Sequence, residues 1–296
     1  MQRRSAAETE ETVTQIIDGK KISAQIKDEV KAQTAALSER GIRLKLAVIQ
    51  VGENPASTVY VRNKQRACEY TGIASEKIAM PEDTTQAELL EKIRELNEDS
   101  AVNGILVQLP LPKGLDANEV IRAISPLKDV DGFHAQSVGA LSIGLPGFKS
   151  CTPAGIIELL KRSGIEIEGK ECVIVGRSNI VGKPMAMMMI RENATVTVAH
   201  SRTVDLPGVC RRADILITAV GKAKMFTRDY VKPGAAVIDC GMNRDENGKL
   251  CGDVDYEDVF PVASAITPVP GGVGPMTVAM LMKNCLDSAR IQGIVK

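Results

Sequence analysis

ECVIVGRSNIVGKP, residues 171–184, is the stretch that decides the fold. Its aliphatic run, 171–176, predicts a buried strand, and a helical pattern follows over 182–192. A glycine-containing turn from a strand into a helix lets backbone N–H groups approach a phosphate, so the segment predicts a dinucleotide-binding unit. Ser178 replaces the middle glycine of the usual fingerprint, and an ordinary tight turn is the alternative interpretation.

The rest of the second half alternates short apolar runs with helical patterns, which is typical of a doubly wound parallel sheet. A turn-rich segment, 266–275, then leads to a last amphipathic helix over 276–290, which we expect to pack back on the first domain. The other predicted elements of this half are a helix over 154–163 and strands over 195–200, 213–220 and 235–241.

The first half shows a similar alternation, so the fold class is α/β throughout. Ser23 is a plausible N-cap for a first helix ending near Arg40, and Gly72 stops a second. Thr85 and Glu88 form a capping box that opens a third. The predicted ranges are strands over 44–51, 77–80 and 104–110 and helices over 23–40, 57–70, 85 onward and 117–124.

Length and composition fix the domain organisation. At about 150 residues per domain, 296 residues predict two domains. Segment 128–153 is rich in Gly, Ser and Pro without strong periodicity, so it is the expected hinge. We expect a disordered tail over 1–15, a catalytic domain over 16–150 completed by a C-terminal helix over 275–296, and a nucleotide-binding domain over 151–274. With only 3% aromatic residues and no Trp, the cores should be aliphatic and filled by Met.

Charge and cysteine content exclude several classes of function. The 37 basic and 37 acidic residues cancel, which leaves no electrostatic case for a nucleic-acid partner. No apolar run reaches the about 18 residues of a membrane span, so no membrane partner is expected. Seven widely spaced Cys and two His predict neither a disulfide framework nor a metal site, and we expect reduced thiols in the cytoplasm.

The end of the second strand of the nucleotide-binding unit indicates which dinucleotide binds. An NAD site usually carries an acid there, whereas residues 199–203 are Ala-His-Ser-Arg-Thr. The missing acid favours NADP, with Arg177, Ser201 and Arg202 available to an extra phosphate. The alternative is that both arginines are solvated surface charges.

Polar residues in the first half suggest chemistry. Tyr60 and Lys64 lie four residues apart on a predicted helix and so share one face. Gln108 interrupts a buried strand and needs a hydrogen-bond partner, and Asp131 belongs to an Asp/Gly turn before the hinge. An exposed lysine beside a half-buried tyrosine is the commoner explanation of such a pair.

Taken together, these motifs closely resemble the methylenetetrahydrofolate dehydrogenase/methenyltetrahydrofolate cyclohydrolase family. The resemblance covers about residues 16–290, in order and without a large gap. The motifs that carry it are Tyr60-Val61-Arg62-Asn63-Lys64, Val107-Gln108-Leu109-Pro110, Lys128-Asp129-Val130-Asp131-Gly132, Gly176-Arg177-Ser178 and the Pro/Gly-rich segment from Pro268 to Pro275.

The resemblance implies a Rossmann-type NADP domain beside a catalytic α/β domain, with folate in a cleft between them and a homodimeric assembly. It implies oxidation of methylenetetrahydrofolate with NADP, then hydrolysis of the methenyl product to formyltetrahydrofolate. Lys64 is then the catalytic lysine and Gln108 its partner, while Tyr60 stacks on folate and Asp131 anchors the pterin. The implied substrate contacts also include Ser57, Pro270, Gly271 and Gly272. The implied cofactor contacts are Thr152, Gly176, Arg177, Ser178, Ile180, Ser201, Arg202, Cys240 and Thr277.

Elementary chemistry agrees with these assignments. Hydride transfer needs mainly positioning, whereas hydrolysis needs a group that moves a proton as the ring opens. A lysine amine beside a cationic substrate and away from bulk water can share a proton at neutral pH. Two alternatives stay open: a dehydrogenase without the hydrolytic step, and a nucleotide-binding module without catalysis.

Overall fold

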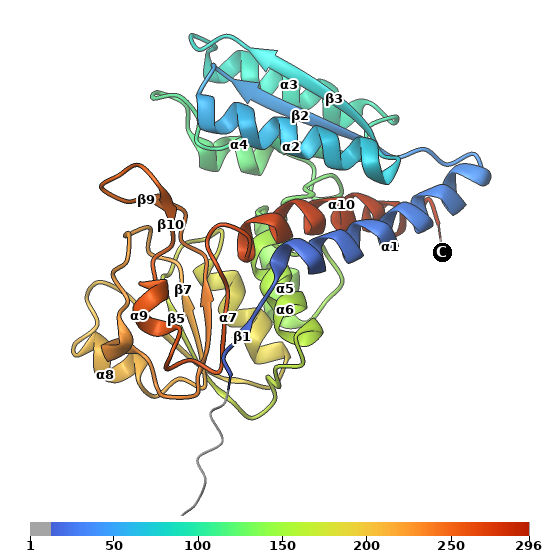
Figure 1. Ribbon diagram of the computed structural model, residues 1–296. Coiled ribbons are helices and arrows are strands. Elements are labelled where there is room, and N and C mark those ends of the chain that lie inside the picture. The colour runs from blue at the N-terminus through green and yellow to red at the C-terminus, as the bar shows by residue number, and fades with distance from the viewer. Residues whose placement is uncertain (1–12, 296) are drawn as a thin grey trace, which may run out of the picture.

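The computed structural model describes residues 13–295 and contains two parallel sheets, one above the other in Figure 1. The larger sheet is six-stranded, and its parallel pairing confirms the predicted doubly wound sheet of the second half. Its strands, in spatial order, are β1 (Gln15–Ile16), β11 (Ala265–Ile266), β8 (Ala236–Asp239), β7 (Ile215–Thr218), β5 (Glu171–Val175) and β6 (Thr195–Ala199).

Helices cover both faces of this sheet because alternate strand residues point to opposite sides. Ile174, Ile217 and Ile238 pack into one core cluster with α6 (Cys151–Arg162) and α7 (Gly182–Arg191). Val173, Val175, Leu216 and Val237 face the other cluster with α8 (Leu206–Cys210), η1 (Arg228–Tyr230) and α9 (Tyr256–Val259). A short hairpin of β9 (Asn243–Arg244) and β10 (Leu250–Cys251) extends from the carboxyl end of β8.

The smaller sheet has the order β3 (Ala74–Met80), β2 (Lys45–Val51), β4 (Gly104–Val107), all parallel. Ala47 and Ile49 of β2 face α3 (Gln86–Glu98) and α4 (Ala117–Ala123), while Leu46 and Val48 join the cluster that contains α2 (Pro55–Thr71). The predicted strands over 44–51, 77–80 and 104–110 are therefore present, with somewhat different ends.

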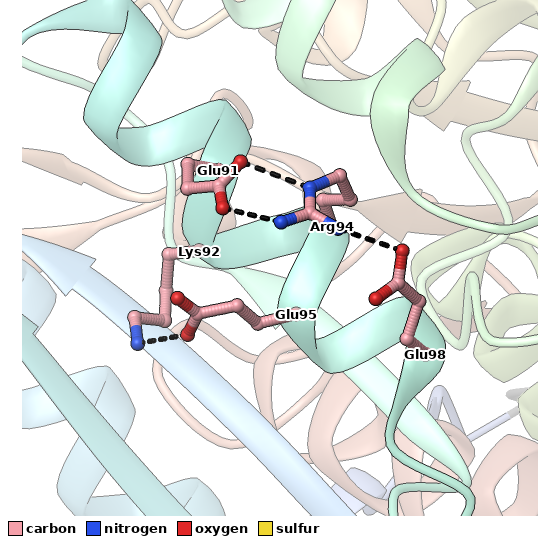
Figure 2. Close-up of polar contacts among 5 residues, drawn as sticks. All are labelled: Glu91, Lys92, Arg94, Glu95 and Glu98. Carbon is pink, nitrogen blue, oxygen red and sulfur yellow. Dashed lines mark hydrogen bonds and ion pairs between the residues drawn. The ribbon is translucent and has the colours of Figure 1, made fainter.

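The outer face of α3 carries a network of ion pairs (Figure 2). Arg94 contacts Glu91 and Glu98, and Lys92 contacts Glu95, all one turn apart along the helix. The predicted capping box is confirmed, because the Thr85 backbone N–H donates to Glu88 and the Glu88 N–H donates to Thr85. Exposed pairs of this kind each contribute only about 0.3–0.5 kcal/mol, and the exposed side chains show that this face of α3 is solvated.

Two long helices, α1 (Gly19–Glu39) and α10 (Val273–Ile291), lie side by side between the sheets (Figure 1). As expected, the last helix packs on α1 and α2, and it packs on α6 as well. One apolar cluster therefore runs from the small sheet to the large one, and methionines fill much of it, as the low aromatic content predicts: Met185, Met188, Met189, Met276, Met280 and Met282.

The structure corrects three of the predicted boundaries. Asp18, not Ser23, is the N-cap of α1, because its side chain accepts from the Lys21 N–H at 3.0 Å. The expected hinge contains α5 (Ala135–Ile143), a short helix whose periodicity is too weak to detect in the sequence. Of the expected tail, residues 1–12 lie outside the described part. The Thr14 hydroxyl donates to the carbonyl of Phe260, and Gln15 pairs with Ala265 in the large sheet.

Candidate functional site

Helix α2 carries three of the predicted site residues, Ser57, Tyr60 and Lys64. The helix begins where Asn54 accepts from the Ser57 N–H at 3.1 Å, with Pro55 in its first turn, and ends at Gly72 in the left-handed region. Lys64 is only 9% exposed, which is unusual for a lysine that forms no ion pair among the described side chains. Because burying an unpaired amine is costly, Lys64 is a candidate functional residue and not a solvated surface charge.

The partner of this amine is the predicted one. Lys64 Nζ donates to Gln108 Oε1 at 2.9 Å, and Gln108 Nε2 donates to the Leu109 carbonyl at 2.6 Å. Gln108 directly follows β4, and its N–H donates to the Ile49 carbonyl of β2. The strand end and the helix therefore hold the lysine by a neutral group, which orients the amine without adding a charge.

Asp131 lies in the loop between α4 and α5, where burial raises the pKa of its carboxyl group and the positive charge of Lys64 lowers it. The two side chains are thus close enough to interact electrostatically. Asp129, in the same motif, was not predicted as a site residue. It is 2% exposed and accepts from the His134 N–H at 2.8 Å and the Ser137 hydroxyl at 3.0 Å, which fixes the loop to α5.

Asp129→Asn should remove part of the pH dependence of stability. Burial raises the pKa of Asp129 from the usual 3.8 to about 7, so the folded protein binds this proton more tightly than the unfolded chain does. Its contribution to stability is therefore full at low pH and is lost as the pH rises from about 4 to about 7, by at most about 1.4 kcal/mol per pH unit. The free energy of unfolding from urea titrations, wild type minus variant, should fall across this window.

Asp258→Asn is the matched control for that measurement. Hydrogen bonds from the backbone and side chain of Arg228 lower the pKa of Asp258, so its contribution to stability is full above the ordinary Asp range and is lost as the pH falls through and below that range. The corresponding difference should stay constant from about pH 5 to 7. A flat difference for Asp129→Asn as well would show that Asp129 does not titrate in this window.

The loop between β5 and α7, the predicted phosphate cradle, requires glycine at two positions. Gly176 has a φ of +135°, and a Cβ there would lie 2.4 Å from the Ala219 carbonyl oxygen. A Cβ on Gly182 would lie 2.1 Å from the Gly176 carbonyl oxygen. Ser178 Oγ accepts from the Val181 and Gly182 N–H groups at 3.1 and 3.3 Å, so the serine shapes the start of α7. Only glycine fits the two positions where backbone must come close.

The outer edge of this loop is positive and exposed. Arg177 follows β5 and Arg202 follows β6, and these strands pair directly through Val175 and Ala199. Ser201, directly before Arg202, is also exposed. The side chain of Ile180 is exposed as well, and its backbone carbonyl accepts from the Ser150 hydroxyl at 2.7 Å. No ion pair among the described side chains involves either arginine. Their guanidinium groups therefore remain available to an anion.

The predicted residues for the other end of the cofactor come from three elements. Thr152 in the first turn of α6 and Thr277 in the second turn of α10 are joined by a hydrogen bond of 2.9 Å between their hydroxyls. Cys240 directly follows β8. Burial raises the pKa of the Cys240 and Cys151 thiols well above the usual value, which keeps both protonated and suits small apolar groups better than nucleophiles.

The segment 270–272 leads into α10 and contacts the first turn of α1. The Val269–Pro270 peptide is cis, and Gly271 has a φ of +115° with its carbonyl accepting from the Lys20 N–H at 3.1 Å. A Cβ on Gly272 would lie 2.6 Å from the Thr267 side chain. Backbone therefore approaches the neighbouring elements more closely here than any side chain would permit.

One contact across the site could not be foreseen. The Tyr60 hydroxyl of α2 donates to the sulfur of Met242, which follows β8, and Met242 Cε lies 3.3 Å from where a Cβ on Gly274 would be. Burial raises the pKa of Tyr60, in keeping with this enclosed position. Met242 belongs to none of the recognised motifs, so only the folded structure identifies it.

The structure thus brings Lys64, Gln108 and Asp131 together and joins Thr152 to Thr277. Tyr60 contacts the far side through Met242. Arg177 and Arg202 stand at the outer edge, linked to the others by no hydrogen bond within the described range. Among residues 13–295, no group of three or more His, Cys, Asp and Glu side chains is arranged to hold a metal, and no helix there is long and apolar enough to cross a membrane.

Two family models match the chain. Residues 17–131 match the catalytic domain of tetrahydrofolate dehydrogenase/cyclohydrolase, and residues 150–293 match its NAD(P)-binding domain. Lys64, Gln108 and Asp131 fall in the first match, and the phosphate cradle falls in the second.

Individual proteins agree over nearly the whole length. A bifunctional protein FolD from Lachnoclostridium phytofermentans is 64% identical over 275 residues, which are 93% of this chain and 98% of the relative. The crystal structure of the bifunctional enzyme FolD from Campylobacter jejuni superposes with a TM-score of 0.92 at 50% identity, covering 94% of this chain and 99% of that one. A Trypanosoma brucei methylenetetrahydrofolate dehydrogenase-cyclohydrolase, solved with NADP and an inhibitor, has a TM-score of 0.90 at 37% identity, covering 96% and 99%.

Proposed function

Because the chain belongs to the tetrahydrofolate dehydrogenase/cyclohydrolase family, we propose that one site between its two sheets serves both of the family's reactions. The chain is a bifunctional, NADP-dependent enzyme of one-carbon metabolism. It oxidises 5,10-methylenetetrahydrofolate to the 5,10-methenyl form and hydrolyses that product to 10-formyltetrahydrofolate, both reversibly. The 2.9 Å hydrogen bond between the buried Lys64 amine and Gln108 supports the hydrolytic step, and the contact of Tyr60 with Met242 across the two halves supports a shared site.

The residues around the cradle fit NADP. Gly176 allows the tight turn into α7, because a Cβ there would clash with the Ala219 carbonyl oxygen. No acid follows β6 directly, so no neighbouring carboxylate there repels a further phosphate from Arg177, Ser201 and Arg202. When bound, NADP supplies the acceptor for the hydride. We assign Gly176, Arg177, Ser178, Ile180, Ser201 and Arg202 to its phosphates and Thr152, Cys240 and Thr277 to its reacting end.

In the hydrolysis, side chains beside the smaller sheet carry out the proton transfer. Water adds to the methenyl carbon, and the resulting proton must reach a ring nitrogen for the ring to open. Lys64 Nζ, oriented by Gln108, is placed to pass that proton. We assign Asp131 to two donors of the pterin ring, Tyr60 to stacking on it, and Ser57, Pro270, Gly271 and Gly272 to the walls around the folate.

Arg177→Ala should raise the KM for NADP about tenfold, because it removes one charge-assisted contact with the extra phosphate. Such a contact contributes roughly 1.4 kcal/mol, which corresponds to a tenfold change in binding. The KM for NAD, which lacks the extra phosphate, should hardly change. Arg94→Ala on the outer face of α3 is the control, since it removes an exposed arginine far from the cradle. Steady-state kinetics with both dinucleotides would contradict the phosphate assignment if the NADP constant stayed at its wild-type value.

A homodimer in the cytoplasm completes the proposal. The resemblance to the family supports the dimer, and the seven free cysteines suit a reducing compartment. Analytical sedimentation of the purified chain measures the oligomeric state, and a single monomeric species would contradict the proposed homodimer.

One assay tests the function itself. Purified chain is mixed with methylenetetrahydrofolate and either NADP or NAD, and absorbance follows the methenyl intermediate and its decay. NADP-dependent appearance followed by enzyme-accelerated hydrolysis is expected. Appearance without accelerated decay would favour a dehydrogenase alone, and no change with either dinucleotide would favour a binding module without catalysis.

A further inference from the structure

Two buried carboxylates stand at the carboxyl end of the large sheet, outside every motif assigned above. Asp239 ends β8 and is 3% exposed, and Asp253 follows β10 and is fully buried. No lysine or arginine side chain within the described residues forms an ion pair with either. Burying unpaired charge is costly, so each carboxylate must be held by other polar groups.

Asp253 fixes two loops at once. Its Oδ2 accepts from the backbone N–H groups of Val220 and Gly221 at 2.7 and 3.2 Å, and its Oδ1 accepts from the Lys222 N–H at 2.9 Å. The Asn243 side-chain amide also donates to Oδ1 at 2.9 Å. A single carboxylate thereby ties the turn after β7 to the loop after β8.

Asp239 in turn fixes Asp253. Its Oδ1 accepts from the Gly241 and Asp253 N–H groups at 2.8 and 2.9 Å, and its Oδ2 accepts from the Val254 N–H at 2.9 Å. Glycines permit this packing, because a Cβ on Gly252 would lie 1.8 Å from Asp239 Oδ2. The two carboxylates form one unit whose four oxygens accept mainly from loop backbone N–H groups, with Asn243 and Thr218 adding one side-chain donor each.

The loops held by this unit border the proposed cofactor site on both sides. The turn after β7 starts at Ala219, whose carbonyl oxygen lies against Gly176 of the phosphate cradle. The loop after β8 carries Cys240 and Met242, and Met242 contacts Tyr60. Carboxyl ends of parallel strands meet at one edge, and β5 and β7 flank the point where the strand order reverses.

We propose that Asp253, held in place by Asp239, is a positioning residue for the oxidation step: it sets the two loops that receive the dinucleotide without touching it. The inference rests on the proposed function, because it assigns a role at that same site. Neither carboxylate faces Lys64 or Gln108 through any hydrogen bond among the described residues. The unit reaches the folate side only through the contact of Met242 with Tyr60, and the Lys64–Gln108 pair that moves the proton in hydrolysis does not depend on it directly.

The bifunctional enzyme offers an internal test. In Asp253→Asn, the amide presents an N–H₂ group to backbone donors and loses at least one accepted hydrogen bond. The KM for NADP in the oxidation should rise about tenfold or more. Hydrolysis of added methenyltetrahydrofolate, measured with no dinucleotide present, should stay within about twofold of the wild type.

Asp245→Asn is the matched control, since Asp245 also accepts backbone N–H groups, from Asn247 and Lys249, but within the hairpin of β9 and β10. It should leave both activities unchanged. If Asp253→Asn does not fold, Asn243→Ala removes one donor to the same carboxylate and should show a smaller rise with the same split between activities.

An unchanged KM for NADP in the folded variant would overturn the inference, and so would an equal loss of both activities, which a merely structural role produces. Failure of the proposed function is distinguishable, because the wild-type enzyme would then lack NADP-dependent oxidation before any variant is compared.

Discussion

Lys64→Met is expected to lower the rate of methenyl hydrolysis by about 10²- to 10⁴-fold, the usual contribution of a positioned acid–base group. Methionine has similar length but cannot donate or move a proton, and it leaves Gln108 Oε1 without the donor it has at 2.9 Å. Oxidation should suffer much less, because hydride transfer depends mainly on how the two reactants are held. The two activities, measured separately on one preparation, should therefore diverge.

Lys77→Met on β3 is the control for this prediction, because Lys77 is exposed and belongs to neither part of the site. It should keep both rates. A Lys64→Met enzyme that hydrolyses methenyltetrahydrofolate at the wild-type rate would refute the catalytic assignment of Lys64.

Asp131→Asn is expected to weaken folate in both reactions, raising each KM for folate roughly 10- to 100-fold. A carboxylate can accept two donors from the pterin, whereas the amide of asparagine accepts with one oxygen and presents N–H₂ on the other side. The substitution also removes the negative charge that interacts with Lys64. Unlike Lys64→Met, it should affect oxidation and hydrolysis alike.

Asp83→Asn, an exposed position after β3, serves as the control and should leave both constants unchanged. A normal KM for folate in Asp131→Asn, or a loss confined to one reaction, would show that Asp131 does not anchor the ring that both reactions share.

Much of the fold could be predicted because local patterns determine it. Val173, Ile174 and Val175 form a strand because they are aliphatic and bounded by a glycine turn, and Thr85 and Glu88 cap a helix within four residues. Both of these inferences depend on short separations along the chain. The pairing of Lys64 with Gln108 comes instead from the family resemblance, and it is formed in the structure because α2 and Gln108 follow the adjacent parallel strands β2 and β4.

What could not be predicted depends on contacts between distant residues. Gln15 joins a strand almost at the other end of the chain, and two residues carry no pattern that reveals it. Met242 contacts Tyr60, 182 residues away in the sequence. Asp253 accepts from the turn after β7, whose nearest hydrogen-bonded residue is 31 positions earlier in the chain. Helix α5 could not be predicted because its apolar and small residues follow no clear period. Its N-cap is also the side chain of His134, which is not one of the usual capping residues.

The apolar cluster shared by α1, α10 and α6 has a consequence for how the enzyme moves. Met276 and Met280 of α10 pack in the same core as Ile26 of α1 and Ile156 of α6, so the small sheet and the large sheet share one close-packed interior. Close-packed interiors deform little. The distance between Lys64 and the carboxyl edge of the large sheet is therefore held nearly constant. Adjustment to the substrate is left to loop residues outside this interior, such as the half-exposed Met242.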